Sequence, residues 1–195
     1  MLNYKNFILP IAGLLSGIAA ASLYLEDNPL EIVILFGGPG LVFAIFMTIA
    51  IFLSYNGKSR RWGIPLFLLI STVGYFVSVW GVIFLTNILL PGATAFFVAG
   101  LVGGGIMLMG LKIMLPVRWY DILNISILAG LLAWAAVWIN YNIITEKNVY
   151  HSDMFTIGPY IETLNQSGLF LLHTLWNTIV AYLISTIILR KNTNV

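Results

Sequence analysis

The sequence predicts an all-α, polytopic integral membrane protein, folded as a bundle of six transmembrane helices with both termini in the cytoplasm. Its composition, the spacing of its apolar stretches and the placement of its charges all indicate this fold class. Of the 195 residues, 60% are hydrophobic and only 8% are charged, whereas about 25% of the residues of a soluble domain are charged. So few charges cannot cover a surface in water, and most of the surface is expected to face lipid.

Six stretches are long and apolar enough to cross a bilayer, which takes roughly 20 helical residues. The predicted helices cover residues 6–25, 32–55, 64–89, 93–115, 120–141 and 168–189 of a single transmembrane domain, residues 1–195. Short connections such as "EDNPLE" and "NILLPGA" carry the Pro, Gly and Asn residues typical of turns. A long outer loop over 142–167 precedes the last helix.

Charges separate to the two sides of the membrane in this arrangement. One side holds the basic residues Lys5, Lys58, Arg60, Arg61, Lys112, Arg118, Arg190 and Lys191, with Asp121 as its only acid. The other side holds Lys147 and the acids Glu26, Asp27, Glu31, Glu146, Asp153 and Glu162. Because Lys and Arg in short loops stay in the cytoplasm, the pattern predicts cytoplasmic termini and a multi-pass location in the cell membrane (plasma or inner).

The first predicted helix has two features of a secretory signal peptide, since Lys5 precedes an apolar run that ends in "AAAS". The apolar region of a signal peptide spans only about 7–15 residues, so a retained helix is favoured here. The helix also carries the G-x-x-x-G motif of Gly13 and Gly17, which lets helix backbones approach closely in lipid.

The second predicted helix contains "FGGPG", which makes Gly37, Gly38, Pro39 and Gly40 a candidate helix break. Pro39 has no N–H and clashes with the preceding turn, so the helix must kink or break there. One interpretation is a kink that neighbouring helices make tolerable. The other is a discontinuous helix whose freed backbone groups meet an ion or substrate, as in many transporters.

The fourth predicted helix is rich in glycine. "GLVGGGIMLMG" includes Gly100, Gly103, Gly104, Gly105 and Gly110, which lowers helix propensity and must be offset by packing. We therefore expect this helix at the centre of the bundle; the alternative is a backbone that lines a substrate path. "AGLLSG" (12–17) and "AGLVGG" (99–104) resemble each other, as in two inverted three-helix halves, but "AGLL" recurs at 129–132 and six letters do not establish a repeat.

The last predicted helix carries the polar segment "LLHTLWNTIVAYL", residues 171–183. His173, Trp176 and Asn177 are spaced i, i+3 and i+4, so they share one helix face. Either this face hydrogen-bonds across helices as a structural contact, or it lines an outward-facing, aromatic pocket for a ligand. The candidate ligand-binding residues are His173, Trp176, Asn177, Trp80, Trp134, Trp138 and Asn140.

No Asp, Glu, Lys or Arg lies deep within any predicted span. Pumps, voltage sensors and ion carriers usually hold such residues at mid-membrane, so these classes are disfavoured. Cysteine is absent, and His151, Asp153, Glu162 and His173 share the outer side without a tight ligand motif. The sequence therefore assigns no metal, no cofactor and no catalytic residue.

Two short resemblances involve the same segment. "HTLWN" resembles the His-x-x-x-Asn of rhomboid proteases, and "GLVGGGIMLMG" is similar to their nucleophile-bearing helix. That resemblance implies Gly103 or Gly104 where a serine is required and puts the His–Asn pair in the wrong helix, so proteolysis is not supported. "HTLW" resembles the His-x-x-Trp of zinc-binding, alkaline-ceramidase-like hydrolases, but Asn177 replaces that motif's second histidine and the ligands of other helices are missing.

These observations predict a non-catalytic integral membrane protein, acting as an assembly subunit or as a binder of a lipid or small apolar ligand. A small oligomeric carrier or channel that uses the helix break is the alternative, and an intramembrane metal-dependent hydrolase is the second. The expected partners are the bilayer, such a ligand and further subunits of a homo- or hetero-oligomer. A net charge of +2 gives no indication of nucleic-acid binding.

Overall fold

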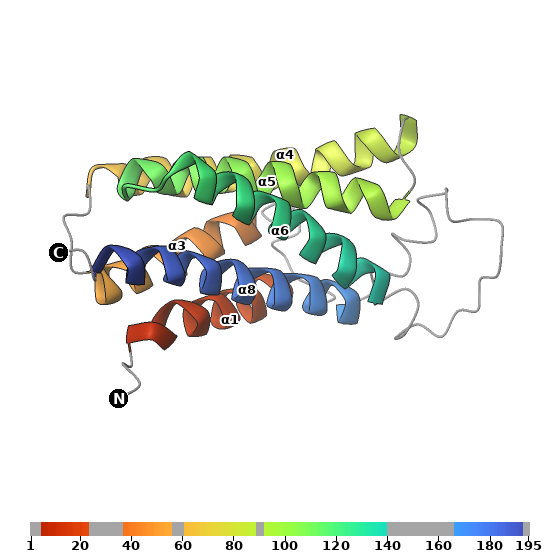
Figure 1. Ribbon diagram of the computed structural model, residues 1–195. Coiled ribbons are helices and arrows are strands. Elements are labelled where there is room, and N and C mark those ends of the chain that lie inside the picture. The colour runs from red at the N-terminus through yellow and green to blue at the C-terminus, as the bar shows by residue number, and fades with distance from the viewer. Residues whose placement is uncertain (1–4, 24–36, 56–60, 89–91, 140–165, 193–195) are drawn as a thin grey trace.

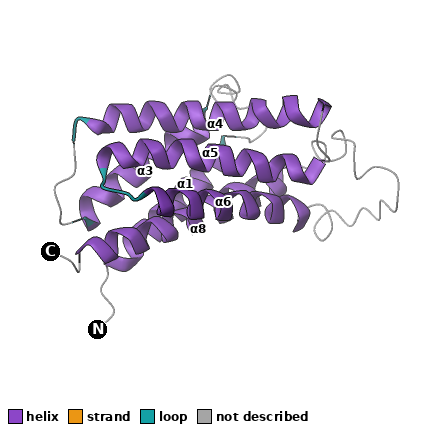
Figure 2. Ribbon diagram, turned by 45° about the horizontal axis from the view of Figure 1, so that its top comes forward, coloured by secondary structure: helices purple, strands orange, loops and turns teal. Residues whose placement is uncertain are grey.

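A computed structural model describes residues 5–23, 37–55, 61–88, 92–139 and 166–192. Within these ranges the chain forms helices and no strands, so the predicted all-α class is confirmed. The helices are α1 (Lys5–Ser22), α3 (Gly38–Ser54), α4 (Gly63–Ile88), α5 (Gly92–Met114), α6 (Trp119–Ile139) and α8 (Gln166–Asn192). Their axes are roughly aligned, and the helices form one bundle (Figures 1 and 2).

Four helices are long and apolar enough to cross a membrane. The spanning stretches are Gly63–Gly81 in α4, Thr94–Met114 in α5, Trp119–Ile139 in α6 and Leu171–Arg190 in α8. The apolar parts of α1 and α3, Phe7–Ser22 and Gly38–Ser54, are shorter. The four long helices support a membrane protein, whereas α1 and α3 fall short of the lengths that the sequence predicted for the first two spans.

Helix α3 begins at Gly38, within the stretch 32–55 for which the sequence predicted a kink or break. Gly37 caps the helix with φ 105° and ψ 17°, a left-handed conformation that a right-handed helix cannot pass through. Pro39 follows in the first turn, where its missing N–H leaves no helical hydrogen bond unmade. The polypeptide before Gly37, residues 24–36, lies outside the described residues.

The helices close into a ring that follows chain order. Each packs against the next, from α1 through α3, α4, α5 and α6 to α8, and α8 packs back against α1. Helices α1, α4 and α6 start at the same end of the bundle at which α3, α5 and α8 finish (Figure 1). The described basic residues Arg61, Lys112, Arg118 and Arg190 therefore gather at that one end, which we call the basic end.

The ring divides into two groups of three helices by packing. Helix α1 packs against both α3 and α8, and α5 packs against both α4 and α6. The two groups meet where α3 contacts α4 and where α6 contacts α8, the latter being the smallest interface between neighbours in the ring. Both groups contribute to one apolar core, which includes Leu9, Met47, Phe67, Leu108, Ile122 and Ile184.

Candidate functional site

The G-x-x-x-G motif of α1 packs on the polar segment of α8. A Cβ at Gly13 would lie 2.5 Å from the carbonyl oxygen of Asn177 and 2.6 Å from Cβ of Ala181. A Cβ at Gly17 would lie 2.6 Å from Cα of Thr174. The two backbones are therefore in direct contact, as small residues permit in membrane helices.

The crossing of α5 and α6 repeats this arrangement. A Cβ at Gly100 would lie 2.6 Å from the carbonyl oxygen of Ala129, 3.0 Å from Cα of Gly130 and 2.8 Å from Cβ of Ala133. These partners have the same spacing along α6 as residues 177, 178 and 181 have along α8. The "AGLLSG" and "AGLVGG" strings thus mark two equivalent crossings that run in opposite directions (Figure 1).

This equivalence does not divide the chain into consecutive halves. The last helix, α8, belongs with α1 and α3, and the other group is α4, α5 and α6. The helix expected at the centre of the bundle, α5, is one member of the ring and packs between α4 and α6. Gly100 and Gly104 face α6, while Gly103 and Gly110 face Ser78 and Ile70 of α4. These α5 glycines therefore serve helix packing on two faces.

Asn177 makes a hydrogen bond between helices. Its Nδ2 donates to Oγ of Ser16 over 3.2 Å, and Ser16 Oγ in turn donates to the carbonyl of Gly13 over 2.8 Å. Both side chains are buried. The hydrogen bond joins α8 to α1 at the glycine crossing.

Trp176 contacts three helices from the centre of the ring. Its Nε1 donates to the carbonyl of Ala129 in α6 over 3.1 Å. Its ring meets that of Phe43 in α3 edge-on, with centroids 5.9 Å apart, and a Cβ at Gly104 of α5 would lie 3.7 Å from Cζ2 of the indole. The same Ala129 carbonyl that accepts this hydrogen bond also lies at the α5–α6 crossing.

His173 is buried and faces the opposite wall of the ring, where its ring centroid lies 5.9 Å from that of Tyr75 in α4. Tyr75 and Ser71 also flank the start of α3, because a Cβ at Gly40 would collide with the Ser71 carbonyl oxygen and with Cβ of Tyr75. We call Ser71, Tyr75 and His173 the interior polar cluster. The first turn of α3 lies beside it.

One hydroxyl group of this cluster, Ser71 Oγ, is buried without a hydrogen-bond partner, as is Thr174 Oγ1, whose backbone lies against Gly17 of α1. Ser71 is only 3% exposed. It lies one helical turn from Tyr75 on the same face of α4, and this face reaches His173. Sequence reasoning did not single out Ser71 or Tyr75, although their i, i+4 spacing within an apolar helix was a visible signal.

The predicted pocket tryptophans outside α8 do not join the segment on α8 in the described part of the chain. Trp80, Trp134 and Trp138 are 46%, 38% and 43% exposed. Their described ring contacts lie on their own helices, with Trp134 stacked on Trp138 at 6.4 Å and Trp80 5.9 Å from Phe76. Asn140 lies outside the described residues. Depth along a helix was predictable from sequence, but the direction in which each side chain points around the bundle was not.

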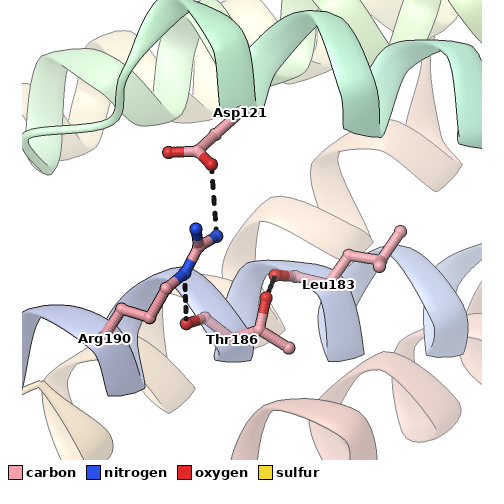
Figure 3. A network of polar contacts seen from close by, with 4 residues as sticks. All are labelled: Asp121, Leu183, Thr186 and Arg190. Atoms are coloured by element: carbon pink, nitrogen blue, oxygen red, sulfur yellow. Dashed lines mark hydrogen bonds and ion pairs between the residues drawn. The ribbon is translucent and has the colours of Figure 1, made fainter.

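An ion pair joins α6 to α8 at the basic end. Nη2 of Arg190 lies 3.1 Å from Oδ1 of Asp121, and the two side chains point toward one another between the helices (Figure 3). The Asp121 side chain is 10% exposed and that of Arg190 is 63% exposed. Arg190 Nε also donates to the Thr186 carbonyl over 3.3 Å. The sequence predicted Asp121 and Arg190 on the same side of the membrane but did not predict that they form an ion pair.

The described residues contain no group of three or more His, Cys, Asp or Glu side chains that could hold a metal ion. Three residues that share the outer side with His173 in the sequence analysis, His151, Asp153 and Glu162, lie outside the described ranges. Comparison of the chain with protein-family models, curated proteins and solved structures finds no match.

Proposed function

We propose that the protein is a non-catalytic membrane protein that binds a lipid or small apolar ligand carrying one hydrogen-bonding group. The observation that carries the proposal is the buried Ser71 hydroxyl, which has no hydrogen-bond partner. A buried polar group left unsatisfied costs about 1–3 kcal/mol, and the hydrocarbon core supplies no water to satisfy it. A hydroxyl or carbonyl of a bound ligand removes that cost.

The surroundings of Ser71 fit such a ligand. Tyr75, one helical turn from Ser71, packs against the ring of His173, and ligand sites are typically apolar and aromatic with few polar groups. The charged side chains that the structure describes lie at the basic end and not at the depth of Ser71. A charged group would find no counter-ion here, so the ligand is neutral where it meets Ser71.

Binding is tested with hexadecanol as the probe, by native mass spectrometry of the purified protein in detergent. Ser71→Ala is expected to weaken binding about fivefold, because a net hydrogen bond contributes about 1 kcal/mol. Ser78→Ala is the matched control, since Ser78 Oγ already donates to the Gly74 carbonyl over 2.6 Å. Equal binding by the Ser71→Ala variant and the unmodified protein contradicts the proposal.

The proposed topology has six membrane-crossing helices, with the basic end in the cytoplasm of the plasma or inner membrane. The gathering of the described basic residues at one end supports it. Because the chain contains no cysteine, single-cysteine variants report one position each. An impermeant maleimide should label Tyr120→Cys only from the cytoplasmic side and Trp138→Cys only from outside. The reverse result refutes the orientation.

A small carrier is the second candidate, and the start of α3 favours it. Gly37, Gly38 and Pro39 are buried, and the first-turn N–H groups of a helix have no acceptor within it. In transporters with broken helices, helix ends inside the protein bind substrates through such backbone groups. If Gly38→Leu and Pro39→Ala leave solute uptake by reconstituted vesicles unchanged, this candidate is refuted.

A further inference from the structure

The interface between α6 and α8 differs from three of the other contacts around the ring. The α1–α8 and α5–α6 crossings bring backbones together at Gly13 and Gly100, and the α3–α4 contact does so at Gly37, whose Cβ would lie 2.5 Å from the Thr72 carbonyl oxygen. The polar links between α6 and α8 are instead made by long side chains, Trp176 to Ala129 and Arg190 to Asp121. It is also the smallest interface between ring neighbours.

The remainder of this interface is apolar. Along the sequence, Ile122 and Ile125 of α6 and Val180, Ile184 and Ile187 of α8 lie between the residues of the two polar links, and all five are buried in the apolar core. Such side chains contact an acyl chain as favourably as they contact each other, because lipid tails and aliphatic side chains are equally apolar. Separation of α6 from α8 therefore costs little apolar contact if a lipid chain takes the space.

The ion pair at the basic end has an exchangeable partner. Arg190 is mostly exposed, and its guanidinium binds phosphate as well as carboxylate through parallel N–H···O hydrogen bonds. Asp121 lies in the first turn of α6, where the helix dipole favours its charge even without Arg190. A phosphate group can thus replace Asp121 as the partner of Arg190, and the helix dipole offsets part of the cost of leaving Asp121 unpaired.

We propose that the α6–α8 interface is a lateral entrance for a phospholipid from the leaflet at the basic end. The lipid phosphate binds Arg190 in place of Asp121, and an acyl chain passes between the two helices toward Trp176. The Asp121–Arg190 pair keeps the entrance closed when no lipid occupies it. This inference rests on the ligand-binding function proposed above, for which it supplies a route from the membrane. The phosphate stays at the basic end, so the part of the lipid that reaches the interior is neutral.

The test uses phosphatidylglycerol with a diazirine in one acyl chain, added to the full-length protein in vesicles and cross-linked by light. Cross-links should form at Ile184, which is 1% exposed in the closed bundle, and at Leu69 of α4, which is 59% exposed and serves as the internal control. Arg190→Gln should lower cross-linking at Ile184 about fivefold, and Asp121→Asn should raise it by a similar factor. Leu69 should be unaffected by either change.

A diazirine diacylglycerol, which lacks the phosphate, should cross-link at Ile184 more strongly in the Arg190→Gln variant than in the unmodified protein, because the substitution removes the ion pair that closes the entrance. The proposal is overturned if Leu69 is cross-linked and Ile184 and Ile187 are not, or if cross-linking at Ile184 ignores both substitutions. A parallel rise at Ile51 of α3, which is fully buried, would indicate general loosening and also overturn it. If hexadecanol binding still depends on Ser71 in that case, the ligand site is supported and only the entrance is refuted.

Discussion

The side-chain amide of Asn177 donates a hydrogen bond to the hydroxyl of Ser16, 3.2 Å away, and so joins α8 to α1. The two residues are 161 positions apart in the chain. They meet because Gly13 and Gly17 bring the two backbones into contact. Part of the polar segment of α8 is therefore used to associate helices, while its neighbour His173 faces α4.

Asn177→Leu should lower the free energy of unfolding by about 1 kcal/mol, the upper range for interhelical hydrogen bonds in membranes. Thermal unfolding in detergent measures it, and a double-mutant cycle with Ser16→Ala isolates the pair. Thr186→Val is the control, because Thr186 Oγ1 donates only to the Leu183 carbonyl of its own helix (Figure 3). Strict additivity of the two changes would contradict a direct Asn177–Ser16 interaction.

The two glycine crossings should respond alike to a methyl group. Gly13→Ala and Gly100→Ala each place Cβ against a carbonyl oxygen of the facing helix, and we expect each to cost about 1–3 kcal/mol of stability. A Cβ at Gly81 would meet nothing within 4 Å, so Gly81→Ala should be neutral or stabilise α4 by up to about 1 kcal/mol. Thermal unfolding of the three variants checks this, and a stable Gly13→Ala variant would refute the close approach.

Gly37→Ala should destabilise the protein more than Pro39→Ala. Alanine at φ 105° is strained, and its Cβ meets the Thr72 carbonyl oxygen, so we expect a loss of about 1–3 kcal/mol. Pro39 lies in the first turn of α3, where alanine fits as well, and a loss below about 1 kcal/mol is expected. The comparison again uses thermal unfolding, and the opposite order would show that Gly37 is not left-handed.

Trp176→Phe should cost about 1 kcal/mol, because it removes the N–H that donates to the Ala129 carbonyl while it keeps an aromatic ring near Phe43. Trp134→Phe is the matched control, since Trp134 is partly exposed and stacks on Trp138 in its own helix. Chemical unfolding measures the two losses. Equal losses would argue against a central position for Trp176.

Much of the fold followed from hydrophobic length, and much of the site did not. The six helices lie where the apolar stretches predicted them, apart from the early end of α1 and the late start of α3. For α3, "FGGPG" was identified as a break or kink, but only the left-handed φ of Gly37 distinguishes the two. The pocket prediction collected tryptophans at one depth, and three of them turned out to be exposed.

The sequence by itself determined the class of the protein, the ends at which charges gather and the glycine motifs that let helices meet. These properties depend on local length, composition and spacing, which are fixed within a helix. Only the tertiary structure decided which helices are neighbours, that Asn177 meets Ser16, that Asp121 meets Arg190 and that Ser71 lies beside Tyr75 and His173. The reason is that in lipid every apolar face is equally acceptable to the solvent, so hydrophobicity does not orient a helix, and close packing between specific surfaces does.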